Sequence, residues 1–313
     1  MKPKTKLGRR SELANNLWRH RGLVPFVIPG LILVIMFEYI PMYGQILAFK
    51  RFDFRLGITD SPWVGLDNFK FLFQNSTIAW RMIRNTVGYY FLFTAVGLVC
   101  NITLAIALYE CVSRRFVKVS QTIMIMPTFI SYIAVAMILR GLIGGNGLIT
   151  NLIEFVTGEN IMFYTQAKYW PLILTLVNVW KGTGYGSILY LAYLTGMDQE
   201  LFEAAAIDGA TKWQRIKYIT IPLLSNIVAI RLLMGLGGIM NSNTGLFYQV
   251  TGNIGLLYST TQTIDAYVLN AMMNSSNFGA TAAVTLFQNA IGTFMLIVVN
   301  LVVKKISPEH SIF

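Results

Sequence analysis

The hydrophobic positions of the chain fall into long, nearly uninterrupted runs separated by shorter polar segments. About 20 consecutive, mostly apolar residues are needed to cross a bilayer as a helix. In lipid a helix satisfies its own backbone hydrogen bonds, whereas an open strand does not. The pattern therefore predicts an all-α integral membrane protein with six transmembrane helices. The windows are residues 23–49, 86–109, 120–142, 169–194, 219–240 and 280–303.

The polar segments predict how the chain is oriented. The first window follows a basic segment, has no small-residue cleavage site and continues through Pro41, so we expect an uncleaved span and not a signal peptide. Cytosolic segments of membrane proteins carry an excess of Lys and Arg. We therefore expect both termini in the cytosol. The expected parts are a basic cytosolic segment 1–22, a membrane domain 23–305 with cytosolic loops 109–120 and 195–219, and a cytosolic tail 306–313.

Composition agrees with this class and excludes others. Of the 313 residues, 55% are hydrophobic and 12% are charged, whereas about a quarter of a soluble domain is charged. The net charge of +11 does not indicate nucleic-acid binding, because the basic residues gather at the N-terminus and in short loops and no zinc-ligand spacing accompanies them. His20 and His310 lie near opposite ends, which excludes a histidine-ligated metal site. We expect no disulfide, because Cys100 lies inside an apolar window and Cys111 just past its end, on the cytosolic side.

The outer segment between the first two windows contains the sequence WVGLDNFKFLF. Asp67 is placed to cap a short interfacial helix there, because a carboxylate accepts the free N–H groups of a first helical turn. Phe69, Leu72 and Phe73 would then pack onto the membrane surface.

The polar segment before the fifth window has helical signals of its own. Asp198 is placed to cap a helix that continues through three alanines, and Gly209 supplies the left-handed residue that ends it. Thr211 and Gln214 have the spacing of a capping box, which predicts a second helix. The pattern predicts a helical hairpin.

This hairpin has two interpretations from its residues alone. Its small alanines would let a partner protein approach closely, while Leu201 and Phe202 would offer that partner apolar anchors. An ordinary loop that merely connects two spans explains the same residues equally well.

The order of residues favours the first interpretation. In EAAAIDGATKWQRIKYITIP, Gly follows EAA after three residues and Ile-x-Ile-Pro follows after nine more. This pattern resembles the EAA motif of permease subunits of binding-protein-dependent ABC importers, and only Ile221 departs from it, where the family usually has Leu. The resemblance implies a coupling helix that docks in a cleft of a cytosolic ATPase subunit. The residues that would hold this role are Glu203, Ala204, Ala205, Asp208, Gly209 and Pro222, with Ala210 beside them.

The sequence lacks a nucleotide-binding motif, so the energy for transport has to come from another subunit. The sequence has no GxxxxGK[ST] phosphate loop, and KGTGYGS does not fit that spacing. We therefore expect no enzymatic activity and no cofactor in this chain, with ATP and Mg bound by the separate ATPase subunit.

The resemblance covers residues 20–305 and includes three longer stretches. The first, VWKGTGYGSILYLAYLTGMDQELFEAAAIDGATKWQRIKYITIPLL, is similar to the carbohydrate-uptake branch of the family, as are WVGLDNF and YVLNAMMNSSNFGATAAVTLF. The long basic N-terminus and TIDAYVL resemble permeases for complex or acidic oligosaccharides, including the alginate type. The resemblance implies a bacterial cytoplasmic membrane, a second homologous permease, an ATPase dimer and an extracytoplasmic binding protein that delivers the oligosaccharide.

Charged residues inside the windows are candidates for the translocation path. A charge at the bilayer centre costs about 2.5 kcal/mol or more, so it usually faces a cavity or a partner. Arg231 lies near the middle of the fifth window, and Glu38 is the only acid in any window. We expect Arg231 to line the path and to favour a sugar carboxylate; snorkelling to the interface is the alternative. Lys181 belongs to the family pattern WK..G, which implies an architectural role.

Aromatic and amide side chains are the other candidates. Sugar rings stack on aromatic rings and sugar hydroxyls need hydrogen-bond partners. We therefore predict Trp180 and Tyr185 as substrate-path residues, with Asn241, Gln288 and Asn289 as hydrogen-bonding partners. The alternatives are helix packing for the aromatics and interhelical hydrogen bonds for the amides.

Three other functions have to be weighed. An amino-acid or peptide permease would share the EAA motif, but the WVGLDNF resemblance favours a sugar. A non-transporting scaffold or sensor needs neither a coupling hairpin nor aromatic-lined spans. An integral membrane enzyme should show intramembrane acids, histidines or a nucleophile constellation, and the sequence shows none of these.

Overall fold

Apolar runs of the sequence form long helices, and the glycines, prolines and asparagines between them form the connections. The computed structural model describes residues 22, 24–70, 76–275 and 277–306. The two expected cytosolic ends lie outside the described residues, apart from residues 22 and 306. Two residues of the predicted interfacial helix, Leu72 and Phe73, also lie outside them. The described part of the chain has no strand, only two isolated β-bridges, Lys50–Trp63 and Asp53–Gly57.

Helices account for most of the described residues. The α-helices are α2 (Val24–Val34), α3 (Ile40–Met42), α4 (Gly57–Asp60), α6 (Ser76–Tyr109), α7 (Arg114–Ile125), α8 (Tyr132–Ile143), α9 (Leu148–Thr157), α10 (Trp170–Thr195), α11 (Glu200–Ile207), α12 (Lys212–Arg215), α13 (Ile221–Leu236), α14 (Tyr258–Thr261), α15 (Ile264–Ser275) and α16 (Phe278–Ile306). Short 3₁₀ or π segments connect or extend them: η1 (Ile35–Tyr39), η2 (Tyr43–Phe49), η3 (Asp67–Phe69), η4 (Met126–Phe129), η5 (Phe163–Thr165), η6 (Ala167–Tyr169), η7 (Ile216–Thr220), η8 (Gly245–Val250) and η9 (Gly255–Leu257).

Five segments of the described chain are long and apolar enough to cross a membrane. They confirm the predicted all-α membrane architecture, while the predicted count of six spans is not confirmed. Four of them coincide with predicted windows, and the fifth begins within the predicted window 120–142 and continues past it. The segments are Pro25–Phe49, Thr77–Tyr109, Tyr132–Thr157, Lys212–Leu236 and Phe278–Leu301.

The prediction of one continuous helix over residues 120–142 is wrong. The chain leaves the helix at Ile125, makes the 3₁₀ turn η4 and starts α8 at Tyr132. Pro127 has no N–H to continue the hydrogen-bond ladder. Ser131 then caps the new helix, its hydroxyl accepting the N–H of Ala134 at 3.2 Å. The apolar run is therefore shared by two helices that point in different directions.

The predicted window 169–194 is filled by α10, which is less apolar than the five segments because it contains Lys181 and three glycines. This helix lies against α6, α7 and α13, and many of its residues are buried, among them Trp170 and Leu174. At Gly184 the backbone of α7 approaches so closely that an added Cβ would overlap the carbonyl group of Met124. A helix shielded on one face by other helices needs less apolar surface, which accounts for its composition.

The second span begins about ten residues before the predicted window (Ser76 against residue 86). Its first turns carry Arg81 and Arg84, which hydropathy assigns to a loop. The structure pairs them with a neighbouring segment: Arg81 donates to the side chain of Gln262 and Arg84 to the carbonyl oxygen of Ser259. These contacts hold the polar start of α6 in a helix.

The predicted cap at Asp67 is also wrong. Asp67 is the first residue of η3, and its carboxylate pairs with Lys70 at 2.7 Å instead of capping a helix. The hydrogen bond and charge of Lys70 lower the pKa of the Asp67 carboxyl. Phe69 packs inward against the cluster around Met82 and Val284.

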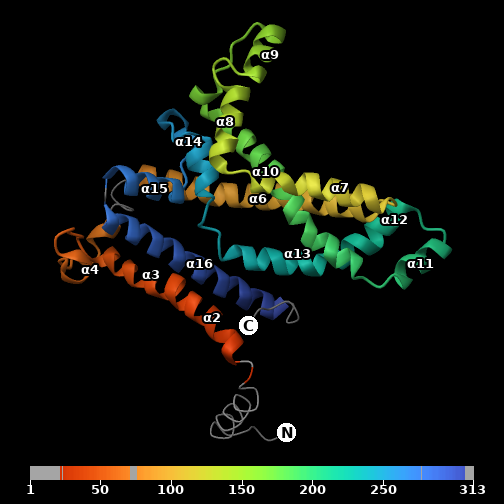
Figure 1. The fold of residues 1–313 in the computed structure, drawn as a ribbon, viewed down its shortest axis with the longest axis horizontal. Coiled ribbons are helices and arrows are strands. Elements are labelled where there is room, and N and C mark those ends of the chain that lie inside the picture. The colour runs from red at the N-terminus through yellow and green to blue at the C-terminus, as the bar shows by residue number, and fades with distance from the viewer. Residues whose placement is uncertain (1–21, 23, 71–75, 276, 307–313) are drawn as a thin grey trace, which may run out of the picture.

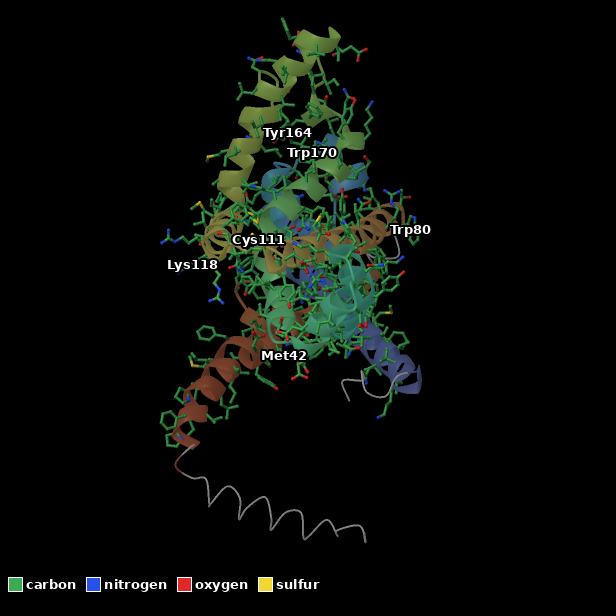
Figure 2. All side chains as sticks on the ribbon, turned by 90° about the vertical axis from the view of Figure 1, so that its right-hand side faces the viewer. Met42, Trp80, Cys111, Lys118, Tyr164 and Trp170 are labelled. Carbon is green, nitrogen blue, oxygen red and sulfur yellow. The ribbon has the colours of Figure 1, made fainter. Side chains whose placement is uncertain are left out.

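The arrangement of the helices separates two ends of the molecule (Figure 1). Helices α6, α7, α10 and α13 run side by side, with α11 and α12 at one end and α14 and α15 at the other. Helices α8 and α9 project from this bundle. Helix α2 and the C-terminal part of α16 slope the same way in Figure 1, and Figure 2 shows that they diverge from one another.

Candidate functional site

The predicted hairpin is present at the end of the bundle, and its capping geometry is confirmed. Gly209 ends the first helix with a φ of +79°, the left-handed conformation expected of it. The Thr211 hydroxyl accepts the N–H of Gln214 at 3.4 Å, and the Gln214 side chain accepts the N–H of Thr211 at 2.7 Å. Asp198 accepts the N–H of Glu200 at 3.0 Å, although Gln199 stands at the cap position.

Phe202 anchors the hairpin to its own chain. Its ring is buried, with 6% exposed, and lies 5.9 Å from the ring of Tyr109 at the end of α6. The Tyr109 hydroxyl also exchanges hydrogen bonds with the side chain of Gln199. The prediction that Phe202 offers an apolar anchor to a partner is therefore wrong, because the side chain is already covered; Leu201 remains half exposed.

The outward face of the hairpin carries two large apolar side chains that the sequence reasoning missed. Ile207 is 86% exposed and Trp213 is 80% exposed, on either side of the turn at Gly209. Their signal was available, because both are large apolar residues in the otherwise polar or small-residue stretch 203–215 of the hairpin. Of the residues assigned to coupling, Ala205 is half-buried and the exposed ones are Glu203, Ala204, Asp208, Gly209 and Pro222.

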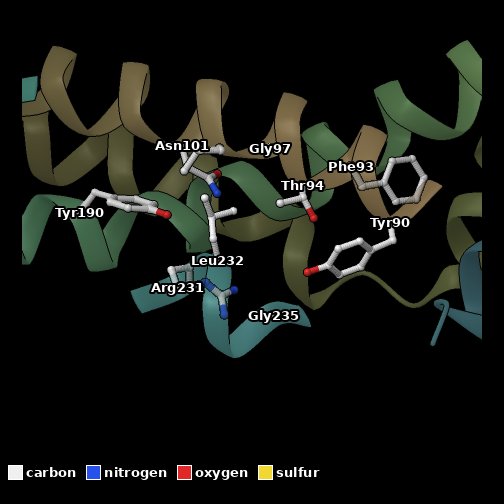
Figure 3. Close-up of a pocket in the computed structure, with 10 residues that line it drawn as sticks. Tyr90, Phe93, Thr94, Gly97, Asn101, Tyr190, Arg231, Leu232 and Gly235 are labelled. Atoms are coloured by element: carbon white, nitrogen blue, oxygen red, sulfur yellow. The ribbon is translucent and has the colours of Figure 1, made fainter. Parts of the chain in front are cut away.

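A pocket of about 280 Å³ lies between α6, α10 and α13 (Figure 3). Arg231 enters it from α13, and Tyr190 from α10 (Figure 3). The complete lining is Tyr90, Phe93, Thr94, Gly97, Leu98, Asn101, Tyr190, Arg231, Leu232 and Gly235. The structure therefore places the exposed Arg231 in the lining of a pocket, together with aromatic rings and an amide, while its position on a translocation path stays a prediction.

Two polar groups of this pocket have no hydrogen-bond or ion-pair partner among the described residues. The side-chain oxygen of Asn101 is buried without a hydrogen-bond partner among the described residues. The one ion pair in the described part of the chain joins Lys70 and Asp67, so Arg231 is not paired with Glu38. Arg231 and Asn101 thus present unmatched charge and hydrogen-bonding capacity between aromatic walls.

The other predicted substrate-path residues do not line this pocket. Trp180 and Tyr185 are exposed on α10, and Asn241 and Asn289 are exposed on other parts of the chain. Gln288 is buried, and its side-chain nitrogen donates to the carbonyl oxygen of Met240 at 2.7 Å and to Asp265 at 3.1 Å. Gln288 thus hydrogen-bonds other segments of the chain, the alternative given for the amides, and its place on the path stays a prediction.

The residues that sequence reasoning missed come mainly from α6. Tyr90, Thr94, Gly97 and Asn101 recur at intervals of three or four residues and therefore share one face of the helix. This stripe within an apolar span is readable from the sequence, although the pocket that it shares with Arg231 is not.

Lys181 has a structural role. Its ammonium group is buried and donates to the carbonyl oxygens of Pro127 at 3.0 Å, Thr128 at 3.1 Å and Ile130. These carbonyls lie at the break between α7 and α8, where the α-helical hydrogen-bond pattern is interrupted and the Pro127 oxygen also accepts the N–H of Ile130 at 3.2 Å. The Thr128 hydroxyl returns a bond to the carbonyl oxygen of Lys181 at 2.7 Å. Lys181 therefore fixes the turn between these two helices, in agreement with the expected architectural role.

No group of three or more His, Cys, Asp or Glu side chains that could hold a metal ion occurs among the described residues. The thiols of Cys100 and Cys111 are free.

Comparison with known proteins gives consistent results over nearly the whole chain. Residues 102–308 match the protein family described as the binding-protein-dependent transport system inner membrane component. Protein LplB of Bacillus subtilis is 32% identical, over 94% of this chain and 92% of its own length. The polygalacturonan/rhamnogalacturonan transport system permease protein YteP of the same bacterium is 30% identical, over 96% of this chain and 93% of its own.

Solved structures agree with these relatives. A chain in the crystal structure of a bacterial ABC transporter involved in the import of the acidic polysaccharide alginate matches with a TM-score of 0.82 and 28% identity, covering 95% of this chain and 99% of the other. A second match comes from the alginate transporter in complex with an alginate pentasaccharide-bound periplasmic protein, with a TM-score of 0.81 and 27% identity over 94% of this chain and 97% of the other.

Proposed function

Because the chain belongs to the family of binding-protein-dependent transport system inner membrane components, we propose that it forms half of the path through which an ABC importer moves an acidic oligosaccharide. The chain is a membrane permease subunit and not an enzyme. The names of YteP and of the alginate transporter refer to acidic polysaccharides, and these similarities extend over nearly the full chain.

The observation that carries the proposed substrate class is the cation in the pocket. A guanidinium group binds a carboxylate with two parallel hydrogen bonds, and Arg231 has no ion-pair partner among the described residues. The half-buried Tyr90 supplies a ring on which a sugar can stack, and the half-buried Asn101 belongs to the same lining. Trp180 and Tyr185, exposed on α10, remain candidates for contacts with the sugar outside this pocket.

The hairpin is proposed to couple this path to ATP hydrolysis on a separate ATPase dimer. Glu203, Ala204 and Gly209, with the exposed Ile207 and Trp213, form the surface offered to that partner. Movement of the hairpin reaches the bundle along two connections. One is the contact of Phe202 with Tyr109 of α6. The other is the continuous segment Lys212–Leu236, which carries Arg231.

The distance along the second connection is short. Arg231 follows Arg215 by sixteen residues, about 24 Å at the helical rise of about 1.5 Å per residue. A rigid helix of this length transmits a tilt imposed at the hairpin to the pocket. Closure of the ATPase dimer would therefore change the shape of the site that holds the sugar.

The remaining partners follow from this function. A second homologous permease would complete the path, and an extracytoplasmic binding protein would deliver the oligosaccharide. With both termini and the hairpin in the cytosol of a bacterial cell, the hairpin meets the ATPase, and α14 and α15 lie at the outer end.

The function is tested by ATP hydrolysis of the co-expressed complex in lipid. The binding protein is supplied empty, loaded with an acidic oligosaccharide, or loaded with a neutral oligosaccharide of the same length. We expect stimulation by the acidic ligand that Glu203→Lys abolishes. Arg231→Gln should reduce the ratio of stimulation by the acidic sugar to stimulation by the neutral sugar about tenfold or more. The reason is that a hydrogen bond to a charged group contributes about 1.5–3 kcal/mol.

Three results would contradict the proposal or part of it. Hydrolysis indifferent to the loaded binding protein and to Glu203→Lys would exclude an importer coupled through this hairpin. An unchanged preference for the acidic sugar in Arg231→Gln would leave the importer intact and remove the assigned role of Arg231. Stimulation by carboxylate-bearing peptides instead of sugars would identify a peptide permease.

A further inference from the structure

A second pocket, of about 550 Å³, lies beside the hairpin, where α6 ends, α7 begins and α10 reaches its last turns. The proposed transport function does not use it. Its lining is Leu108, Tyr109, Cys111, Arg114, Val117, Lys118, Gln121, Ile188, Leu191, Ala192 and Thr195.

The lining of this pocket combines two cations with aliphatic walls. Arg114 and Lys118 are one helical turn apart on α7, and neither forms an ion pair with a described residue. The pocket lining contains no acidic side chain. Leu108, Ile188 and Leu191 supply an apolar floor. An uncompensated pair of cations above an aliphatic floor matches a ligand that is anionic at one end and apolar at the other.

The position of α7 puts this pocket at the surface of the membrane. The span Thr77–Tyr109 ends immediately before it. The outer side of α7 exposes the large apolar side chains Phe116, Val119 and Ile123, whereas Arg114 and Lys118 face the pocket. A helix that is apolar on one side and basic on the other lies in the interface between headgroups and acyl chains.

We propose that this pocket binds the phosphate headgroup of an anionic phospholipid. Arg114 and Lys118 neutralise the phosphate, Gln121 hydrogen-bonds the glycerol part, and the acyl chains continue along the apolar side of α7. Basic pockets between spans on the cytosolic side are suited to such headgroups. An acidic protein segment would also satisfy the cations, but it would leave the aliphatic floor and the exposed Phe116 and Val119 in contact with water.

The lipid would act on coupling through Tyr109. This residue lines the pocket and also contacts Phe202 and Gln199 of the hairpin. A bound headgroup therefore touches the side chain that holds the hairpin against α6. The inference uses the proposed topology only to choose the cytosolic leaflet, and it does not depend on the sugar.

The free thiol of Cys111 allows a direct test, because it lines the pocket and is partly accessible. The complete complex, carrying Cys100→Ser, is placed in nanodiscs of phosphatidylcholine with or without phosphatidylglycerol. The rate at which an uncharged maleimide labels Cys111 is measured by mass spectrometry of its peptide. We expect phosphatidylglycerol to slow labelling several-fold and phosphatidylcholine alone to have little effect.

The control residue is Arg115, which lies on the same helix with the same charge but outside the pocket lining. Arg114→Gln with Lys118→Gln should abolish the slowing, while Arg115→Gln should retain it. Lys118→Gln alone removes one charge from an exposed side chain, and we expect it to reduce the slowing of Cys111 labelling by an intermediate amount. This single variant replaces the double variant if the double variant does not assemble.

Four outcomes would overturn the proposal. Equal slowing by both lipids would indicate an apolar cleft without headgroup recognition. Equal slowing by soluble glycerol phosphate would indicate a site for a free anion. Loss of slowing in Arg115→Gln as large as in the double variant would indicate non-specific surface charge. A Cys111 that is unreactive in every lipid and every variant would show that another subunit covers the pocket.

Discussion

Two residues one turn apart on α10, Lys181 and Gly184, determine how this helix packs against α7. Lys181 supplies hydrogen bonds to backbone carbonyls at the break between α7 and α8. Gly184, one turn later, lets the backbone of α7 come into direct contact with α10. Both residues reduce the hydropathy of α10, and both are explained by the adjacent helix.

Gly184→Ala should therefore destabilise the bundle, whereas Gly182→Ala should not. A Cβ at Gly184 meets the Met124 backbone, which cannot move as a side chain does. Overpacking of this kind costs about 1–3 kcal/mol. A Cβ at Gly182 has no neighbour within 4 Å, and Ala is the better helix former by up to about 1 kcal/mol. Thermal unfolding of the complex checks this; equal melting temperatures for the two variants would contradict it.

Gln288 marks the limit of sequence reasoning at the residue scale. Its amide in an apolar window was consistent with either a sugar contact or an interhelical hydrogen bond. The choice depends on Met240 and Asp265, which lie far away in the sequence and meet Gln288 only in the fold. For Arg231 the sequence left a path-lining position and snorkelling open, and only the fold shows that it shares a pocket with α6 and α10.

At the scale of elements, local signals were sufficient for the hairpin. Gly209 and the Thr211–Gln214 capping box specify the turn and the second helix through contacts within four residues, so the sequence predicted both. The anchoring of the first helix through Phe202 was missed, because Tyr109 belongs to another element.

The turn at Gly209 provides a prediction at this scale. With φ at +79°, Gly209→Val should strain the hairpin by about 1–2 kcal/mol, since a β-branched residue does not tolerate the left-handed region. Gly209→Asn should be tolerated, because Asn visits that region. We expect Val to reduce the stimulation of ATP hydrolysis by the loaded binding protein and Asn to preserve most of it. If the two variants lose stimulation equally, the surface at Gly209 matters and its conformation does not.

Hydropathy predicted where most membrane helices lie but not where they begin or break. Four of the five apolar segments agree with their windows because lipid imposes a long apolar run on any exposed span. The break inside residues 120–142 has local signals, the helix breaker Pro127 and the helix cap Ser131. Hydropathy alone does not register them, because the residues around them are apolar. The early start of α6 was not readable, because Arg81 and Arg84 are held by contacts from residues 259–262.

At the scale of the whole molecule, the first span stands apart from the rest. None of the residues in its most apolar stretch is buried, and only its last turns, η2, pack extensively against another helix, α16. Phe37 and Tyr39 remain 68% and 65% exposed. These side chains contribute nothing to the core of this chain, and they are proposed to contact the second permease.

Phe37→Ala with Tyr39→Ala should accordingly weaken assembly without destabilising the chain itself. We expect the second permease to dissociate at a lower detergent concentration during purification, while the protease resistance of this chain stays unchanged. Trp170→Ala is the contrasting variant, because Trp170 is fully buried and its loss should reduce protease resistance directly. Retention of the second permease by the double variant would show that this span faces only lipid.

The isolation of the first span has a consequence for how the protein is made. Residues 25–42 are made before the other described spans, and their side chains stay exposed in the described part of the chain, so we expect this span to wait in the membrane for another polypeptide. A copy synthesised in excess would keep that surface open to membrane proteases and to other unassembled helices. The cell would then have to match the synthesis of the two permeases, and gene dosage would set the amount of working importer.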